Sequence, residues 1–174
     1  MKKITLVIIT MVIVVAILAV MSIPPELAPD RITGYMMTMK KSDLMFVYEV
    51  MRYPASGEII KPEGFNESIK VGIASDTDAL NFGRVPGNGS YLKRYVHLNN
   101  TKEALKVSLK AYGNITPLIE FDENDFVLHK NESVEIGIVF NTVNAKAYGN
   151  YTGEIDIIFK KPQYGFLYSF LGWT

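Results

Sequence analysis

The 174-residue chain contains no cysteine and only two histidines, His97 and His129. The lack of cysteine excludes disulfides, thiolate metal ligands and a thiol nucleophile. Two histidines leave little for imidazole-based zinc or acid–base chemistry, and no Ser–His–Asp arrangement can be built on them. Basic and acidic residues balance at 18 each, so no excess of positive charge favours a nucleic-acid partner. We therefore expect no catalytic, cofactor-binding or metal-binding residues.

The longest hydrophobic run, Ile4–Ile23, contains no charged residue. As a helix it would be about 30 Å long, which matches the hydrocarbon core of a bilayer. It could be a cleaved signal peptide or a retained anchor. The exit sequence "AVMSIPP" is a poor cleavage site, which favours a membrane anchor through residues 4–23. Lys2 and Lys3 then predict a cytoplasmic N-terminus and an extracellular C-terminal domain.

Acceptor motifs for N-glycosylation are unusually frequent. Chance predicts about one Asn-x-Ser/Thr match in a chain of this composition. The sequence has six, and all of them follow the hydrophobic run: Asn66, Asn88, Asn99, Asn114, Asn131 and Asn150. The pattern predicts N-glycosylation outside the cell. An exported chain without cysteine and with this many acceptors resembles archaeal surface proteins.

Beyond the anchor, residues 1–23, the sequence divides into three parts. Residues 24–62 read as a juxtamembrane linker, with a β-prone stretch at Leu44–Tyr53 that Pro54 and Gly57 are expected to end. Residues 63–162 show short hydrophobic runs, among them 69–73, separated by turn signals. Residues 163–174 form an aromatic C-terminal segment.

The hydrophobic residues of 63–162 recur with a period of two, which is typical of strands with one buried face. The opposite positions, such as Glu154 and Asp156, are expected to face solvent. Turn signals every 8–12 residues separate about seven such strands, which predicts an antiparallel β-sandwich. The expected core positions are Phe82, Leu92, Val96, Leu98, Leu105, Val107, Leu109, Val134, Ile136, Ile138, Phe140, Ile155, Ile157 and Phe159. Arg94 is an exception, since it falls on the core side of its strand.

Several of these residues carry a family resemblance over about residues 76–160. Leu80, Phe82 and Gly83 match a "φ-x-F-G" entry, and Leu98 and Asn100 match the end of a later strand. The closing pattern is matched by Gly149, Tyr151, Gly153, Ile155 and Ile157. The region resembles immunoglobulin-like domains of the ASPM–SPD-2–Hydin and major sperm protein group. The resemblance implies an immunoglobulin-like sandwich that binds or assembles with other proteins and has no enzymatic residues.

Two motifs could carry chemistry. The stretch "GRVPGNGS" (83–90) is rich in glycine, but a strand follows it where a phosphate site needs a helix, so it is interpreted as a β-turn. Asp76 and Asp78 could form a D-x-D metal–phosphate pair, and Asp122, Glu123 and Asp125 could offer oxygen ligands to calcium. Neither group has the twelve-residue spacing or the closing glutamate of an EF-hand. Both are interpreted as solvated turns.

The C-terminal stretch "YGFLYSFLGW" leaves three alternatives. It packs under residues 44–53, rests at the membrane interface, or docks another protein. For the whole chain we expect a single-pass membrane protein with a non-catalytic binding, adhesion or envelope-assembly role and with protein partners in the cell envelope. Alternatives are an accessory subunit of an envelope machine, such as a stator, filament or secretion component, and a module of a glycan-processing enzyme system.

Overall fold

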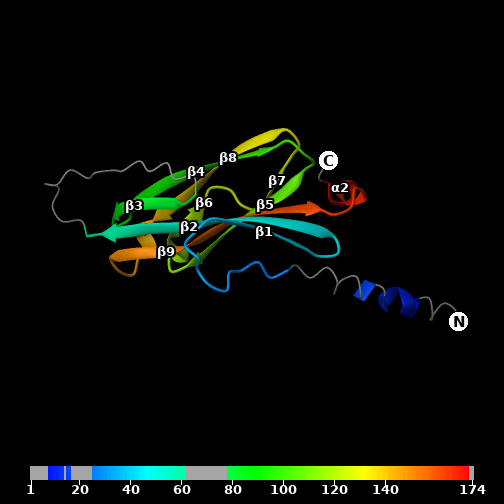
Figure 1. The fold of residues 1–174 in the computed structure, drawn as a ribbon, viewed down its shortest axis with the longest axis horizontal. Coiled ribbons are helices and arrows are strands. Elements are labelled where there is room, and N and C mark those ends of the chain that lie inside the picture. The colour runs from blue at the N-terminus through cyan, green and yellow to red at the C-terminus, as the bar shows by residue number, and fades with distance from the viewer. Residues whose placement is uncertain (1–7, 14, 17–24, 62–77, 173–174) are drawn as a thin grey trace.

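The computed structural model describes residues 8–13, 15–16, 25–61 and 78–172, which fold mostly into antiparallel β-sheet (Figure 1). The larger sheet, sheet A, has the order β1-β2-β9-β5-β7, with β3 also beside β2, and the smaller, sheet B, has the order β4-β8-β6. The elements are β1 (Met37–Ser42), β2 (Phe46–Ile60), β3 (Leu80–Pro86), β4 (Tyr91–Asn100), β5 (Leu105–Gly113), η1 (Thr116–Leu118), β6 (Ile119–Phe121), β7 (Phe126–Leu128), β8 (Glu132–Asn141), η2 (Thr142–Asn144), β9 (Gly149–Pro162) and α2 (Phe166–Leu171).

Residues 8–13 and 15–16 are helical. Within the described ranges, no helix is long and hydrophobic enough to cross a membrane. Most of the predicted anchor, residues 4–23, lies outside those ranges. So do Asn66, Asp76 and the hydrophobic run 69–73.

The two sheets enclose one hydrophobic core, and the positions expected from the period-two pattern line it. Phe82 of β3 and Phe140 of β8 are both fully buried and stack with their ring centroids 5.4 Å apart. Gly57 of β2 makes room for this pair, because a Cβ there would lie 2.9 Å from the Phe140 ring. The core prediction is confirmed: all fourteen expected side chains are buried in this cluster or packed against it.

The predicted end of the strand at Pro54 and Gly57 is wrong, because β2 runs through both residues to Ile60. β9 pairs with β2 from Phe46 to Ile59 and holds it as one strand. On the other edge of β2, β1 pairs up to Arg52 and β3 begins only at Ala55. Pro54 lies in the gap between these two partners, at a point on the edge where a proline is tolerated.

One strand pair departs from the antiparallel expectation: β3 runs parallel to β2. The glycine-rich stretch then forms the turn from β3 in sheet A to β4 in sheet B, so its interpretation as a turn is confirmed. Asn88 and Gly89 have φ angles of 67° and 86° there. Arg94 reaches back across this edge and donates from Nη2 to the Asn81 carbonyl at 2.6 Å, which explains why it interrupts the core pattern of β4.

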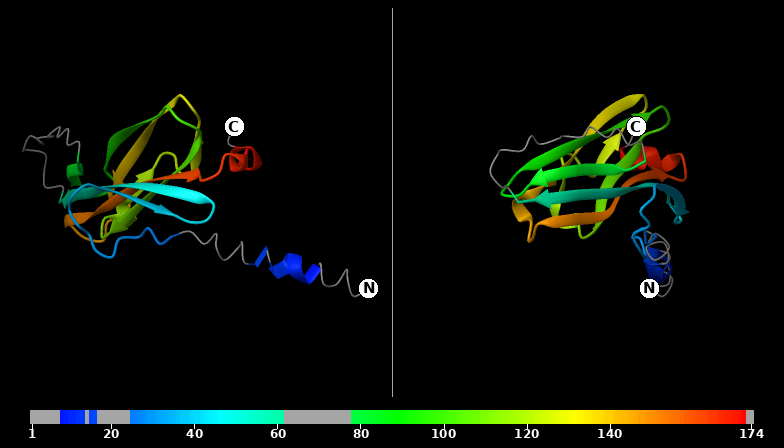
Figure 2. Two further views of the ribbon diagram at one scale, coloured as in Figure 1. Left: turned by 45° about the vertical axis from the view of Figure 1, so that its right-hand side comes forward. Right: turned by 60° about the vertical axis from the view of Figure 1, so that its left-hand side comes forward.

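The strands define two ends of the sandwich (Figure 2). The end of β9 pairs with the start of β2 on one side and with the start of β5 on the other. The α2 pole therefore holds the β1–β2 turn, the loop 101–104, the turn 129–131 and α2. The η2 pole holds the β3–β4 turn, η2 and the loop 145–148. β9 has 14 residues, so the poles are separated by about 40 Å.

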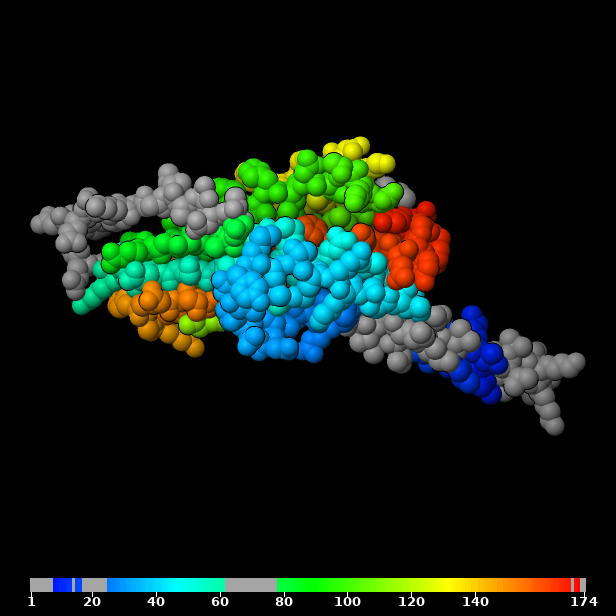
Figure 3. Space-filling model, in the orientation of Figure 1, coloured from blue at the N-terminus to red at the C-terminus, as the bar shows by residue number. Residues whose placement is uncertain are grey.

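Residues 25–36, here called the strap, cross the outer face of sheet A before entering β1 (Figure 3). Leu27 packs there against Tyr48 and Val50 of β2 and Ile158 of β9, all nearly inaccessible to solvent. Beneath the strap, Glu154 and Asp156 have no solvent exposure. The prediction that they face solvent is therefore wrong, because a segment more than 100 residues away in sequence covers them.

Candidate functional site

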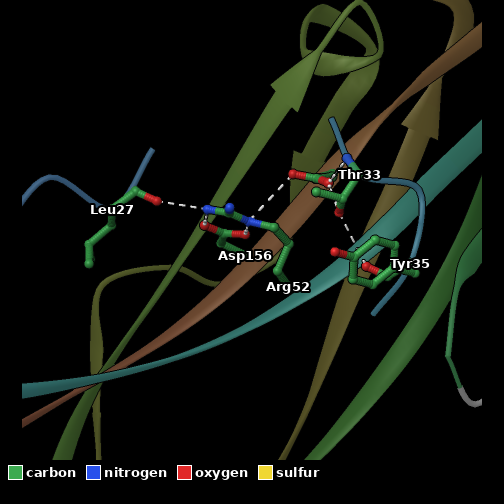
Figure 4. Close-up of polar contacts among 6 residues, drawn as sticks. Leu27, Thr33, Tyr35, Arg52 and Asp156 are labelled. Atoms are coloured by element: carbon green, nitrogen blue, oxygen red, sulfur yellow. Dashed lines mark hydrogen bonds and ion pairs between the residues drawn. The ribbon is translucent and has the colours of Figure 1, made fainter. Parts of the chain in front are cut away.

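A buried ionic cluster fastens the strap to sheet A (Figure 4). Arg52 of β2 lies opposite Asp156 of β9 in the strand register. Its Nε and Nη2 donate to the two carboxylate oxygens of Asp156 at 2.6 and 2.7 Å. Nη2 also donates to the carbonyl of Leu27 in the strap at 2.7 Å. The hydrogen bond to Asp156 raises the pKa of Arg52 above its ordinary value.

Glu154 makes a second attachment to the strap. Its Oε1 accepts from the backbone N–H of Thr33 at 2.6 Å and from the Thr33 hydroxyl at 2.7 Å. Its Oε2 lies 3.4 Å from Arg52 Nε and has no hydrogen-bond partner within the described part of the protein. One guanidinium thus serves two buried carboxylates and a strap carbonyl.

Such a cluster gives little net stability when complete, but it is costly to break, because a buried charge without its partner is strongly unfavourable. Its donors and acceptors are also directional, so they fix the path of the strap over the sheet. The cluster therefore positions the chain segment that follows the predicted anchor.

The η2 pole is also built rigidly. Thr142, which is 2% exposed, donates its hydroxyl to the carbonyls of Pro86 and Ser90 at 3.1 and 2.9 Å. Its own N–H donates to the Ser90 carbonyl at 2.9 Å. Asn141 caps η2 by accepting from the N–H of Val143 at 3.0 Å. These bonds tie η2 to the β3–β4 turn.

Three large side chains project from this pole into solvent. Tyr91 is 71% exposed, Val143 65% and Tyr148 53%. Tyr148 lies over Gly87, where a Cβ would come within 2.7 Å of its ring. The glycines of the β3–β4 turn thus allow both a tight turn and the close approach of an aromatic ring to the backbone. We call Tyr91, Val143 and Tyr148 the tip.

All five predicted acceptor asparagines within the described ranges have exposed side chains. Asn88 and Asn150 lie at the η2 pole, Asn99 and Asn131 lie towards the α2 pole, and Asn114 lies between β5 and η1. Asn114 Oδ1 also accepts from the N–H of Thr152 at 2.6 Å. Exposure makes these sites accessible to a glycosyl carrier, and their modification stays a prediction.

The acidic and histidine positions weighed from sequence are dispersed. Asp122 pairs with Lys93, Asp125 accepts from the Ser108 hydroxyl at 2.6 Å, and His97 lies 2.9 Å from Glu135. Within the described ranges, no three histidine, aspartate or glutamate side chains gather where they could hold a metal ion. Asp78 and Glu123 are exposed, and His129 lines a hollow at the α2 pole.

That hollow is open and has a volume of about 750 Å³. It lies between α2 and the loops 101–104 and 129–131, and Tyr168 and Pro162 form part of its wall. Its wall carries no pair of carboxylates, since Glu103 is the acidic residue that lines it. The hollow is therefore a gap beside a short helix, with no constellation for acid–base catalysis within the described residues.

Comparisons with protein-family models, with curated proteins and with solved structures gave no match. The sequence predicted neither the tip nor the buried cluster of Arg52, Glu154 and Asp156 beneath the strap, here called the strap cluster. A usable signal for the cluster is the run "GEIDII", where two carboxylates alternate with isoleucines in the strand that proves most central. For the tip the signal is weaker, because its residues come from two separate parts of the chain, the start of β4 and the stretch 143–148.

Proposed function

We propose that the chain is a membrane-anchored extracellular protein whose immunoglobulin-like β-sandwich binds a protein partner in the cell envelope, without catalysis. The hydrophobic run 4–23 is the anchor, and the domain beyond it is glycosylated. The observation that carries the proposal is the rigid tip with exposed tyrosines, held about 40 Å from the α2 pole.

The chemistry of the tip suits protein recognition. Tyrosine offers a large contact area with few rotatable bonds, so little conformational entropy is lost on binding. The hydrogen bonds of Thr142 and Asn141 hold the backbone under the tip in place before any partner arrives. Pre-organisation of this kind lowers the cost of association.

The glycan acceptors support an extracellular location. Asn88 lies in the β3–β4 turn and Asn150 two residues after Tyr148, and both are exposed, so sugars there would lie near the tip. The resemblance to the major sperm protein group also implies an assembly role. The arrangement of the strands in two sheets is compatible with the sandwich that this resemblance implies.

Site-specific photo-crosslinking in intact cells tests the proposal. A photoreactive phenylalanine analogue replaces Tyr148 at the tip or, as a matched control, Tyr35 of the strap, which is 60% exposed. We expect a discrete higher-mass adduct from position 148 and none from position 35. Equal adducts from both positions, or none from 148 in cells where the protein is membrane-bound, contradict the binding role of the tip.

Membrane extraction and glycopeptide mass spectrometry on the same cells test the anchor and the glycans. We expect the protein to stay in the membrane after alkaline washing and to carry glycan on acceptor asparagines. Release by the wash contradicts the anchor, and unmodified asparagine at all six sites contradicts the glycoprotein assignment.

A further inference from the structure

The start of the strap, which follows the predicted anchor in the sequence, lies at the α2 pole. Lys41, close to the β1–β2 turn, donates its ammonium to the carbonyl of Glu26. Glu26 is three residues after Ile23, the last residue of the hydrophobic run, and three extended residues span about 10 Å. A membrane crossed by residues 4–23 would therefore have its surface close to the α2 pole and far from the tip.

The α2 pole presents lysines to solvent. Lys41, Lys102 and Lys130 are exposed. Lys41 bonds to a carbonyl, and within the described chain Lys102 and Lys130 form no ion pair with a carboxylate, although Glu103 follows Lys102 directly. Three carboxylates of the pole accept hydrogen bonds: the Tyr48 hydroxyl donates to Asp43, the Lys161 ammonium to Glu49 and the backbone N–H of His129 to Glu132. Glu26 is exposed beside Lys41.

The same pole carries exposed aromatic rings on a fixed support. Leu167 of α2 is 6% exposed, and the N–H of Gln163 donates to the Met45 carbonyl at 2.7 Å, so the start of α2 is held against the β1–β2 turn. Phe166 is 71% exposed, and its ring stacks on Tyr164 with centroids 6.0 Å apart. Lysines beside exposed aromatic rings are typical of protein surfaces that rest in the headgroup region of a bilayer.

We propose that the α2 pole is a lipid-binding surface that rests on the same membrane that holds the anchor. Lys41, Lys102 and Lys130 attract anionic headgroups, and Phe166 and Tyr164 enter the interface. This inference rests on the proposed anchor. It adds an orientation: the long axis of the sandwich stands away from the membrane, and the tip is presented at its far end (Figure 1).

Fluorescence quenching by lipid tests this orientation in the full-length chain. Since the sequence has no cysteine, Ser169→Cys on the exposed side of α2 and Lys146→Cys in the loop at the η2 pole each provide a unique labelling site. Each variant, labelled with bimane, is reconstituted one chain per nanodisc. The lipid is phosphatidylcholine with phosphatidylglycerol and a nitroxide-headgroup lipid. We expect strong quenching at position 169 and none at position 146.

Charge reversal tests the role of the lysines. Lys102→Glu and Lys130→Glu should each weaken docking about fivefold, measured as recovery of the fluorescence at position 169. Lys146→Glu is the matched control, because it changes the same charge on the loop at the opposite pole, and it should leave the quenching unchanged. Omitting phosphatidylglycerol from the nanodisc should also weaken docking and restore fluorescence at position 169.

The outcomes separate this inference from the proposed function. Equal quenching at positions 169 and 146, in chains that co-purify with the nanodisc, overturns the lipid-binding pole and leaves the anchor intact. Quenching at 169 that is insensitive to both charge reversal and phosphatidylglycerol overturns the role of the lysines. Failure of the chain to enter nanodiscs overturns the anchor and the orientation together.

Discussion

The outer faces of the two sheets carry similar alternating sequences but differ in solvent exposure. On β9 of sheet A, Glu154 and Asp156 are completely buried under the strap. On β4 of sheet B, Tyr91 and Tyr95 are more than half exposed, and the His97 side chain is 76% exposed. Alternation decides which side chains point away from the core. What covers those side chains is decided by a segment far away in the sequence.

The two faces therefore use their charges differently. Under the strap, Arg52, Glu154 and Asp156 are each at most 3% exposed, and their interactions take place at low local dielectric. On sheet B, Lys93 pairs with Asp122, and its ammonium also lies 5.1 Å from the centroid of the Tyr95 ring. Both side chains of this ion pair are in contact with water. A covered ion pair is expected to be indispensable, and an open one to be replaceable.

Removing the charge of Arg52, the cation of the strap cluster, is expected to give the largest loss of stability. Arg52→Met leaves two buried carboxylates without a positive partner, which should lower the free energy of unfolding by about 3–5 kcal/mol. Lys93→Met removes the cation of the open pair on sheet B, and its effect should lie within experimental error. Urea denaturation followed by circular dichroism measures both.

Arg52→Lys is the conservative control for this comparison. It keeps the charge and loses the planar fork that holds both oxygens of Asp156, so its stability should fall between those of the wild type and Arg52→Met. If Arg52→Met and Lys93→Met prove equally mild, the strap does not exclude water from the cluster. The contrast between the two faces would then be lost.

A glycine-to-alanine substitution on sheet A, compared with one on sheet B, is expected to give the next largest loss of stability. A Cβ on Gly153 of β9 would lie 2.0 Å from the backbone oxygen of Tyr112, on the neighbouring strand. Gly153→Ala must therefore separate β9 from β5, at a cost of about 3 kcal/mol. On β8, the atoms nearest to a Cβ on Gly137 would be at the ends of the Lys93 and Asp122 side chains, at 2.0 and 2.2 Å.

Those side-chain ends can swing into solvent, so Gly137→Ala should change the free energy of unfolding by less than about 0.5 kcal/mol. Thermal unfolding of the two single variants and the double variant gives the measurement. A cost for Gly137→Ala as large as that for Gly153→Ala would show that the Lys93–Asp122 pair is as constrained as the covered face.

The sequence predicts the sandwich core well because period-two burial is a local signal. Phe82, Ile136 and Ile157 could be placed in the core from their spacing alone, and each is fully buried. The break at Pro54 was predicted wrongly because proline propensity is also local, whereas the 14-residue pairing of β2 with β9 is not. The parallel β2–β3 pair could not be predicted either, since no local pattern encodes it.

The candidate sites could be predicted only in part. The exposure of Asn88 follows from its place in a turn, which sequence identifies well, whereas Asn150 is exposed as the second residue of β9. The strap cluster joins Thr33, Arg52 and Glu154, and the tip joins Tyr91 to the stretch 143–148. Contacts of that range depend on the complete packing of two sheets, which composition and periodicity do not specify.

The smallest expected effect lies on the part of sheet A that the strap leaves open. Asp125 accepts from the Ser108 hydroxyl of β5 at 2.6 Å and lies 3.3 Å from Lys106. The Ser108 hydrogen bond, with support from Lys106, lowers the pKa of Asp125. A carboxyl with a lowered pKa in the folded state stabilises the fold above its unfolded pKa, and this contribution is lost as pH falls through the folded value.

Ser108→Ala should therefore move the pKa of Asp125 back towards its ordinary value and make the loss of stability in acid slightly shallower. An NMR titration of the side-chain carboxyl carbon follows the first effect, and urea denaturation between neutral pH and pH 3 follows the second. The Asp125 side chain is 63% exposed, so the change in stability should be far smaller than that of Arg52→Met. If Ser108→Ala lowers the free energy of unfolding as much as Arg52→Met does, burial under the strap is not what separates the two kinds of charged contact on sheet A.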